Sequence, residues 1–207
     1  MKQMILASEF SGSFEKFKSI LEGHLAKSES KKVLHIMSAK SHYDNYTPYY
    51  ERDIKPYEDM GFIVEIYDLA NKSKEEVRQK VLSSSIINVM GGNTFVLLQH
   101  MKACGFKEIL EECFAKDILY VGCSAGTVVM ANDINYISEM DDITVATLSD
   151  TKGLGFFDTP IVPHVDHSKF NVNAKSITDK FNAQKKDYVS LNDDQYIHVQ
   201  ADTYKMF

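Results

Sequence analysis

The stretch ILYVGCSAGTVVMA, residues 118–131, joins an apolar run to a helix-like run through a turn of small residues. Its centre, GCSAG at 122–126, fits the pattern GxSxG. In that pattern a serine occupies a strained strand-to-helix turn, and its small neighbours allow the backbone to pack closely. The stretch therefore predicts a strand–turn–helix unit with Ser124 at the tip as nucleophile and Cys123 buried beside it.

Short β-branched runs and longer runs of helical period alternate along the first 130 residues. Such alternation is typical of βαβ units, which build a mostly parallel central sheet flanked by helices on both faces. The later part is richer in strands and is expected to add a few antiparallel strands. The predicted strands are 3–7, 32–37, 62–67, 86–90, 118–121, 144–146, 160–162, 188–191 and 196–199. The predicted helices are 13–26, 46–60, 74–82, 94–103, 106–115, 125–131 and 169–184.

Composition narrows the class of protein. The chain of 207 residues suits a single α/β domain spanning 1–207. A net charge of −6 argues against a nucleic-acid partner and against an anionic membrane surface. The apolar runs are too short for a transmembrane helix or a signal peptide. The three cysteines lack CxxC spacing and no HExxH pattern occurs, so we expect reduced thiols in a cytoplasmic protein with no metal and no cofactor.

A second turn of small residues, GGNT at 91–94, follows the predicted strand 86–90. Two glycines at a strand end allow backbone N–H groups to face a ligand. This turn and the N–H of Ala125 at a helix start can together form an oxyanion hole. Asn93 or Thr94 can also serve as an ordinary helix N-cap, and the two interpretations are compatible.

Serine needs a neighbouring base to act as a nucleophile. His164 comes just after the predicted strand 160–162, which places it at the same sheet edge as Ser124. His167 is the alternative base.

A carboxylate must in turn orient the imidazole. The segment SEMDD at 138–142 offers three carboxylates between the serine and the histidine. A second acidic pair, Asp193 and Asp194, follows the predicted strand 188–191.

Three segments together resemble the peptidase E family of serine peptidases, family S51: GGNTFVLLQHM at 91–101, GCSAG at 122–126 and PH at 163–164. The resemblance covers most of the chain. It implies a fold similar to class I glutamine amidotransferase domains, a flavodoxin-like three-layer sandwich. It also implies an aspartyl dipeptidase activity. The wider family contains cyanophycinases, which are similar hydrolases acting on β-aspartyl-arginine polymers.

The resemblance also implies roles for single residues. Ser124 matches the nucleophile and His164 the base. The remaining matches are Gly92 and Ala125 for the oxyanion-hole donors, and Asn93 and Thr94 for the loop that lines the substrate site.

The resemblance points to several carboxylates for the acid. The family's aspartate falls on Asp142 when counted back from the histidine and on Glu139 when counted forward from the serine. We favour Asp142, with Asp141 and Glu139 as alternatives. In cyanophycinase-like members a later glutamate plays this role, and the corresponding place is near Asp193 and Asp194.

One feature departs from the family pattern. The family's aspartyl dipeptidases hold the substrate aspartate with an arginine in the helix after the histidine. That helix contains no arginine here, and its cations are Lys169, Lys175, Lys180 and Lys185. A lysine supplies charge without the bidentate fork that suits a carboxylate, so this helix does not predict aspartate specificity.

The sequence thus predicts a serine peptidase that hydrolyses a dipeptide or another small peptide or amide, as a monomer or homodimer. The alternatives are a cyanophycinase-like or other amidase or esterase, a thiol amidase using Cys123, and a catalytically silent small-molecule-binding protein.

Overall fold

The computed structural model describes residues 1–40 and 50–207. Its strands are β1 (Gln3–Ala7), β2 (Lys32–Ile36), β3 (Ile63–Tyr67), β4 (Ile86–Val89), β5 (Leu119–Cys123), β6 (Ile161–Val162), β7 (Val189–Ser190), β8 (Tyr196–Gln200) and β9 (Thr203–Met206). Its α-helices are α1 (Phe10–Leu25), α2 (Tyr50–Asp53), α3 (Lys55–Asp59), α4 (Lys74–Leu82), α5 (Thr94–Ala103), α6 (Phe106–Ala115), α7 (Ala125–Val128) and α8 (Asn171–Gln184). Short 3₁₀ turns are η1 (Ser38–Lys40), η3 (Asn135–Glu139) and η4 (Ile143–Val145).

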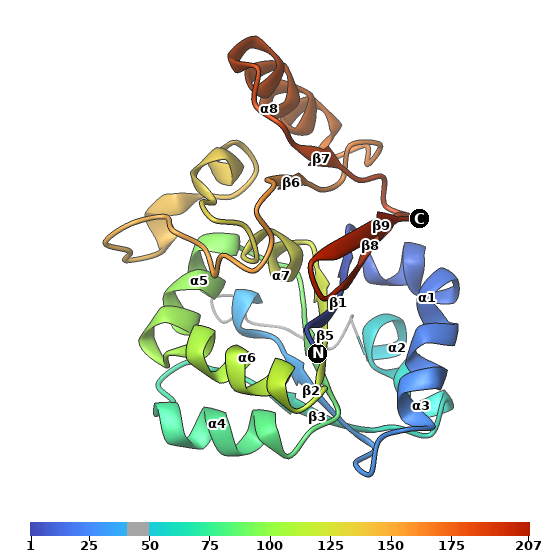
Figure 1. The fold of residues 1–207 in the computed structure, drawn as a ribbon. Coiled ribbons are helices and arrows are strands. Elements are labelled where there is room, and N and C mark those ends of the chain that lie inside the picture. Colours follow the sequence, from blue (N-terminus) through green and yellow to red (C-terminus); the bar gives the residue numbers. More distant parts are fainter. Residues whose placement is uncertain (41–49) are drawn as a thin grey trace.

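In the described residues, seven strands form one sheet in the order β3-β2-β4-β5-β1-β8-β9 (Figure 1). Neighbouring strands from β1 to β5 pair in parallel, whereas β8 is antiparallel to both β1 and β9. Helices α1 to α3 cover one face and α4 to α6 the other. The predicted class, a mostly parallel α/β sheet with a few added antiparallel strands, is confirmed.

The central strands are apolar on both faces because both faces are covered. In β1, Met4 and Leu6 join the core beneath α4 to α7, and Ile5 joins the core beneath α1 and α3. The apolar side chains of α1 recur every three or four residues and form one stripe on the sheet. Within it the rings of Phe10 and Phe14 lie 5.2 Å apart, and each fully buried side chain contributes about 1.5 to 3 kcal/mol.

Two predicted elements differ from the structure. Residues 144–146 were expected as a strand, but η4 occupies this place. The carboxylate of Asp142 accepts the N–H of Thr144, and such a local bond favours a turn over an extended strand. The expected helix 46–60 is divided into α2 and α3. Pro56 lies in the first turn of α3, and because it has no N–H to donate to the carbonyl four residues earlier, α2 cannot continue through it. Residues 46–49 of that prediction lie outside the described residues.

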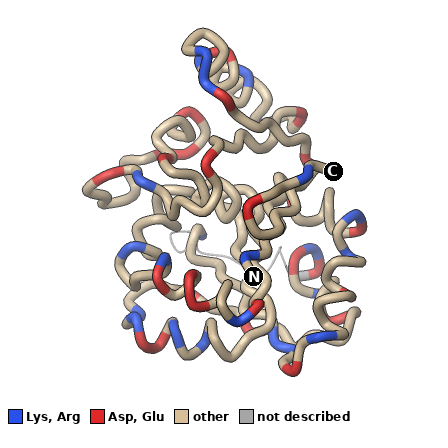
Figure 2. Tube along the Cα trace, viewed as in Figure 1, with Lys and Arg blue, Asp and Glu red and all other residues tan. Residues whose placement is uncertain are grey.

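Positively and negatively charged residues are interspersed along the chain (Figure 2). Helices α4 and α6 are joined by a bidentate pair in which Arg78 donates to Glu112 at 2.7 to 3.0 Å. Such a solvent-exposed pair contributes little to stability, because water and salt screen the two charges. None of the helices in the described part of the chain has both the length and the apolar composition that a membrane span needs.

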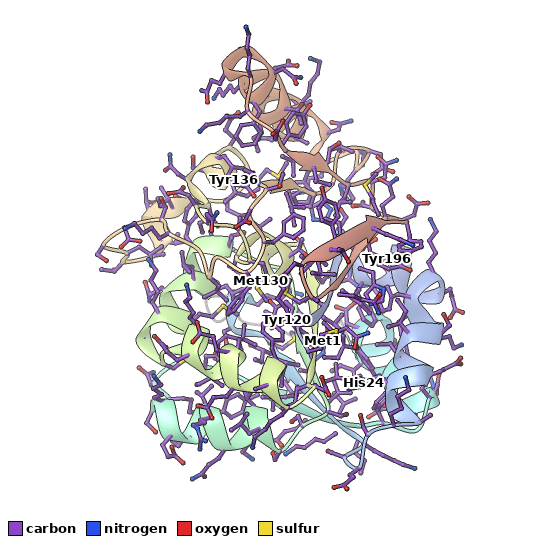
Figure 3. All side chains as sticks on the ribbon, viewed as in Figure 1. Met1, His24, Tyr120, Met130, Tyr136 and Tyr196 are labelled. Atoms are coloured by element: carbon purple, nitrogen blue, oxygen red, sulfur yellow. The ribbon has the colours of Figure 1, made fainter. Side chains whose placement is uncertain are left out.

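Helix α7 packs directly on the sheet. A Cβ added at Gly126 would collide with the carbonyl oxygen of Val89 in β4. The hydroxyl of Tyr120, which lies inside the molecule (Figure 3), donates to the carbonyl oxygen of Gly126 at 2.6 Å. The hydroxyl of Thr127 donates to the carbonyl oxygen of Ala7 at 2.7 Å. The start of α7 is therefore fixed to β1, β4 and β5.

We expect Gly126→Ala to destabilise the protein by about 1 to 3 kcal/mol, because α7 must move away from β4 to admit the methyl group. The control is Gly23→Ala on the exposed side of α1, where nothing lies within 4 Å of the added Cβ. This control should gain about 0.5 to 1 kcal/mol from helix propensity. Chemical denaturation measures both, and equal stability of the two variants would contradict the packing argument.

Candidate active site

Three side chains meet at the carboxyl edge of the strands, where open α/β sheets bind ligands. Ser124 follows β5, His164 comes shortly after β6, and Asp193 comes shortly after β7. The Nε2 atom of His164 lies 2.8 Å from Oγ of Ser124, and its Nδ1 atom lies 2.5 Å from Oδ1 of Asp193. A ring that donates Nδ1–H to the carboxylate leaves Nε2 to accept the hydroxyl proton. This arrangement can activate a hydroxyl for nucleophilic attack.

The backbone of Ser124 is held in an unusual conformation, with φ of 50° and ψ of −110°. A non-glycine residue in such a region costs about 1 to 3 kcal/mol, and surrounding contacts must compensate. The N–H of Ser124 donates to the carbonyl oxygen of Ala7 at 3.1 Å, and Ala125 begins α7 at once. Strand and helix thus hold the serine on a sharp turn, as the GxSxG pattern predicts.

His164 is placed by the small parallel sheet of β6 and β7. Ile161 pairs with Val189 and Val162 with Ser190, so the residues after both strands emerge at the same edge. The backbone of His164 has φ of 62°, in the left-handed region. Its imidazole lies over the ring of Phe170, with centroids 5.2 Å apart.

Asp193 supplies the carboxylate that hydrogen-bonds to the imidazole of His164. Burial raises the pKa of Asp193, but the hydrogen bonds from His164 and Ser8 outweigh this effect, and the pKa lies below its usual value. The carboxylate therefore carries its charge at neutral pH and can stabilise a protonated imidazole.

Asp142, the favoured acid of the sequence analysis, lies elsewhere. Its carboxylate accepts the N–H of Thr144 at 2.8 Å and its hydroxyl at 2.6 Å. The local turn that produces this cap directs the carboxylate back onto its own loop. The contact expected between Asp142 and His164 is therefore made by Asp193, one of the pair that follows the predicted strand 188–191.

The other two acids considered also have different partners. The carboxylate of Asp141 accepts the N–H and the hydroxyl of Thr94 at 2.8 and 2.6 Å. Glu139 forms an ion pair with Lys180 of α8. These contacts tie the loop after α7 to α5 and α8, and Asp141 remains on the wall of the cavity described below.

The glycine turn after β4 packs against the serine. A Cβ at Gly91 would lie 3.0 Å from Cβ of Ser124. Gly92 has φ of 145°, and a Cβ there would collide with the carbonyl oxygen of Ala39. The N–H of Ala125 is at the first position of α7, where no intrahelical acceptor exists. Gly91 and Gly92 line the same cavity as Ser124, and Ala125 follows the serine directly in the chain.

Asn93 and Thr94 have different surroundings. The side-chain oxygen of Asn93 caps α5 by accepting the N–H groups of Phe95 and Val96, at 3.0 and 3.1 Å. Its amide donates to the backbone carbonyl of Asp142 at 2.8 Å. Asn93 therefore serves the structure as an N-cap, whereas Thr94 also lines the cavity.

Cys123 is buried beneath the serine, and its thiol lies 3.8 Å from the backbone carbonyl of Ser8. Burial, reinforced by the nearby charge of Asp53, raises the pKa of this thiol to about 12. The thiolate is the nucleophilic form, so Cys123 is a poor nucleophile at neutral pH. Cys104 and Cys113 are likewise buried free thiols.

Ser124 and His164 open into a cavity of about 440 Å³. Its wall carries charges of both signs and several apolar side chains. The charged lining residues are Glu9, Lys40, Arg52, Asp141 and Lys169, and the apolar ones include Met90, Val128, Ile137, Met140 and Phe170. Within the described residues, no group of three or more His, Cys, Asp and Glu side chains is arranged to hold a metal ion.

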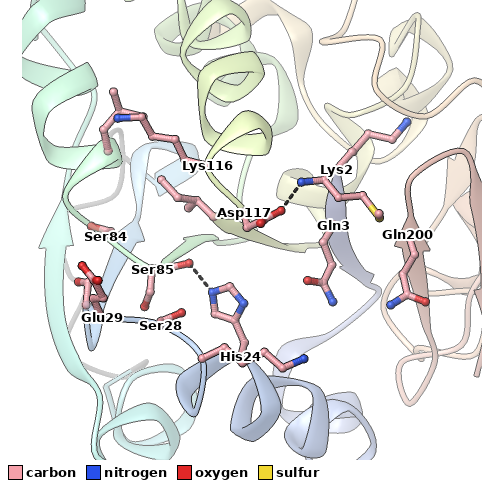
Figure 4. Close-up of a pocket in the computed structure, with 15 residues that line it drawn as sticks. Lys2, Gln3, His24, Ser28, Glu29, Ser84, Ser85, Lys116, Asp117 and Gln200 are labelled. Atoms are coloured by element: carbon pink, nitrogen blue, oxygen red, sulfur yellow. Dashed lines mark hydrogen bonds and ion pairs between the residues drawn. The ribbon is translucent and has the colours of Figure 1, made fainter.

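A larger cavity of about 620 Å³ lies at the opposite, amino end of the strands (Figure 4). Its histidine, His24, is bonded through Nε2 to the backbone carbonyl of Ser85 at 2.9 Å, and Asp117 is paired with the amino group of Met1. Within the part of the chain that the structure describes, the hydrogen bond of this histidine goes to a backbone carbonyl and not to a hydroxyl or thiol. Despite its smaller volume, the cavity at Ser124 is therefore the candidate active site.

The chain is similar to proteins that are named as peptidases. The chain is 31% identical over 196 residues to the uncharacterized peptidase Lmo0363 of Listeria monocytogenes, covering 93% of this chain and 92% of that protein. It is 29% identical over 182 residues to the uncharacterized peptidase PM1590 of Pasteurella multocida, covering 87% and 86% of the two chains.

Solved structures show the same fold. A candidate peptidase E protein from Listeria monocytogenes EGD-e superposes with a TM-score of 0.86 at 28% identity, covering 100% of this chain and 98% of that one. A peptidase from an acI-B1 actinobacterium shares the fold, with a TM-score of 0.70 at 16% identity and coverage of 100% and 87%. The family model for peptidase family S51 matches residues 4–207. Because this match spans nearly the whole chain, the protein belongs to peptidase family S51.

Proposed function

We propose that the protein is a serine peptidase that hydrolyses dipeptides and other small peptides or amides. Ser124 is the nucleophile, His164 the general base and Asp193 the acid that orients it. The observation that carries this proposal is the continuous hydrogen-bonded chain from the hydroxyl of Ser124 through the imidazole to the carboxylate of Asp193. The buried free thiols are consistent with action in the reducing cytoplasm.

In this mechanism the hydroxyl of Ser124 attacks the carbonyl carbon while His164 takes its proton. The imidazolium, stabilised by ionised Asp193, then gives that proton to the leaving amine, and water hydrolyses the acyl-enzyme by the same route. The N–H groups of Gly92 and Ala125 donate to the oxyanion of the tetrahedral intermediate. Each such donor is commonly worth about 3 kcal/mol in the transition state.

The cavity supports a small substrate with charges at both ends. Its volume of about 440 Å³ is in the range of small-molecule sites. Arg52 belongs to the charged part of the cavity wall. Its guanidinium pairs with the carboxylates of Glu9 at 3.3 Å and Asp53 at 2.6 Å. Carboxylates and cations on one wall can receive the ammonium and carboxylate ends of a free dipeptide.

A second candidate is a cyanophycinase-like activity on β-aspartyl peptides. It is favoured by the place of Asp193, which follows His164 along the chain as the acid of cyanophycinase-like members does. Helix α8 supplies no arginine, and its Lys175 and Lys180 are paired with Asp179 and Glu139. An α-aspartyl preference would therefore need a cation from another part of the cavity wall.

The nucleophile can be identified with a serine-directed fluorophosphonate and intact-mass spectrometry. We expect one adduct on the unaltered protein and none on Ser124→Ala or His164→Ala, because only a hydroxyl activated by the base reacts readily. Cys123→Ala should still be labelled, since the buried thiol takes no part. Loss of labelling in Cys123→Ala with retention in Ser124→Ala would instead identify a thiol amidase. No adduct on any variant would favour a binding protein without catalysis.

The acid can be identified by two matched substitutions. Asp193→Asn should lower kcat/KM by about a thousandfold or more, because the amide neither stabilises imidazolium nor fixes the tautomer. Asp142→Asn removes the same charge, but its carboxylate hydrogen-bonds to Thr144 instead of His164, so kcat/KM should remain nearly unchanged. Steady-state kinetics on one dipeptide measures both, and a larger loss in Asp142→Asn than in Asp193→Asn would overturn the assignment of the acid.

The substrate class can be tested with one dipeptide and its N-acetylated and C-amidated forms. Each cap removes a charge that the wall is proposed to bind, so kcat/KM should fall about tenfold or more. A β-aspartyl-arginine dipeptide and a p-nitrophenyl ester complete the panel. Preference for the β-aspartyl peptide would select the second candidate, and activity on the ester alone would indicate an esterase.

A further inference from the structure

Ser8 lies at the end of β1, is fully buried and was not singled out by any sequence motif. Its hydroxyl makes contacts to two members of the proposed triad. The hydroxyl oxygen lies 3.1 Å from Oδ1 of Asp193 and accepts the backbone N–H of His164 at 2.8 Å. It also lies 3.5 Å from Nδ1 of the same histidine.

The direction of these hydrogen bonds follows from the groups involved. A backbone N–H can only donate, and an ionised carboxylate can only accept. The single proton of the Ser8 hydroxyl is therefore directed to Asp193, while a lone pair receives the N–H of His164. Since both partners are fixed, the hydroxyl has one orientation, and it joins the backbone of the histidine to the carboxylate that orients the ring.

The sheet order explains why a residue of β1 reaches both partners. Strand β1 lies between β5, which ends at the serine turn, and β8, which follows Asp193 in the chain. The N–H of Ser8 donates to the carbonyl oxygen of Gln195 at 3.2 Å, and the carbonyl of Ala7 accepts the N–H of Ser124 at 3.1 Å. The end of β1 thus contacts the segments that carry all three triad residues.

Two further contacts hold the backbone of Asp193. Its N–H donates to the carboxylate of Asp166 at 2.9 Å, and a Cβ at Gly12 of α1 would collide with its carbonyl oxygen. These contacts fix the backbone of Asp193, whereas Ser8 and His164 are the side chains that hydrogen-bond to its carboxylate. The hydroxyl of Ser8 is therefore able to set the orientation and the basicity of that carboxylate.

We propose that Ser8 is a positioning residue, whose hydroxyl locks the carboxylate of Asp193 and the left-handed backbone of His164 into the geometry that the serine nucleophile requires. This inference rests on the proposed serine-peptidase function. The hydroxyl acts through Asp193 and His164 and does not touch the substrate. By donating to the carboxylate it also weakens the carboxylate's hold on the imidazole proton, which keeps His164 able to act as a base.

Removal of the hydroxyl has two expected effects. Asp193 loses a donor and becomes more basic, and a more basic carboxylate favours the protonated imidazole, so His164 should hold its proton to higher pH than in the unaltered protein. Within the described residues, the carboxylate is then held only by its contact with His164, and kcat should fall about 10- to 100-fold with little change in KM, because a charge-assisted hydrogen bond is lost. The acid limb of the kcat/KM profile should therefore move to higher pH.

The experiment compares Ser8→Ala with Ser13→Ala. Ser13 is also fully buried, and its hydroxyl donates to the backbone carbonyl of Glu9, the N-cap residue of α1, without contacting the triad. Chemical denaturation, kcat, KM and the pH profile are measured on both variants, and the imidazole of His164 is titrated by NMR without substrate. In Ser8→Ala only, the imidazole of His164 should titrate at a higher pH and kcat should be lower. Unchanged titration in Ser8→Ala, or equal losses of kcat in both variants, would overturn the proposal.

Two further measurements keep the result decisive. If Ser8→Ala does not fold, Ser8→Cys keeps nearly the same shape with a weaker donor, and its His164 titration should shift in the same direction; no shift would overturn the proposal. If the fluorophosphonate labels no serine in the unaltered protein, the proposed peptidase function fails. The NMR titration, which needs no turnover, still decides whether the Ser8 hydroxyl controls the Asp193–His164 pair.

Discussion

The close contact between α7 and the sheet is the constraint on which the rest of the site depends. No side chain fits at Gly126, because the carbonyl oxygen of Val89 occupies the place of a Cβ. The helix can therefore begin immediately after β5, and the chain must turn within a single residue. Ser124 is that residue, which explains both its unusual backbone and the direction of its hydroxyl into the cavity. The same contact places the first N–H groups of α7 beside the serine.

The second requirement is that distant segments end at one edge of the sheet. Parallel pairing of β6 with β7 brings His164 and Asp193 together, although 29 positions separate them. The insertion of β1 between β5 and β8 brings Ser8 to the same point. The pairing partners of β1, β6 and β7 depend on how the whole domain folds, and the sequence of each strand alone does not determine them. The site is therefore a property of strand order rather than of any one motif.

The partly buried carboxyl group of Asp193 and the buried thiol of Cys123 show how burial and hydrogen bonding compete. Burial tends to favour the neutral form of both the Asp193 carboxyl group and the Cys123 thiol. The carboxylate receives hydrogen bonds from His164 and Ser8, and its pKa remains low. The thiol lacks comparable support, and its pKa rises to about 12. This difference supports a serine rather than a cysteine as the proposed nucleophile.

The sequence by itself determined the class of fold, the strand–turn–helix unit at Ser124 and the placement of His164 after an apolar strand. These features depend on local periodicity and on glycines at fixed spacing, which act within one or two neighbouring elements. The acid could not be found in this way. Asp142 has the expected position in the chain, but its carboxylate caps Thr144, and only the tertiary structure shows that the carboxylate in contact with His164 is that of Asp193. The contact with His164 is set by pairing of two short strands, and strand pairing is a non-local interaction that only the folded chain reveals.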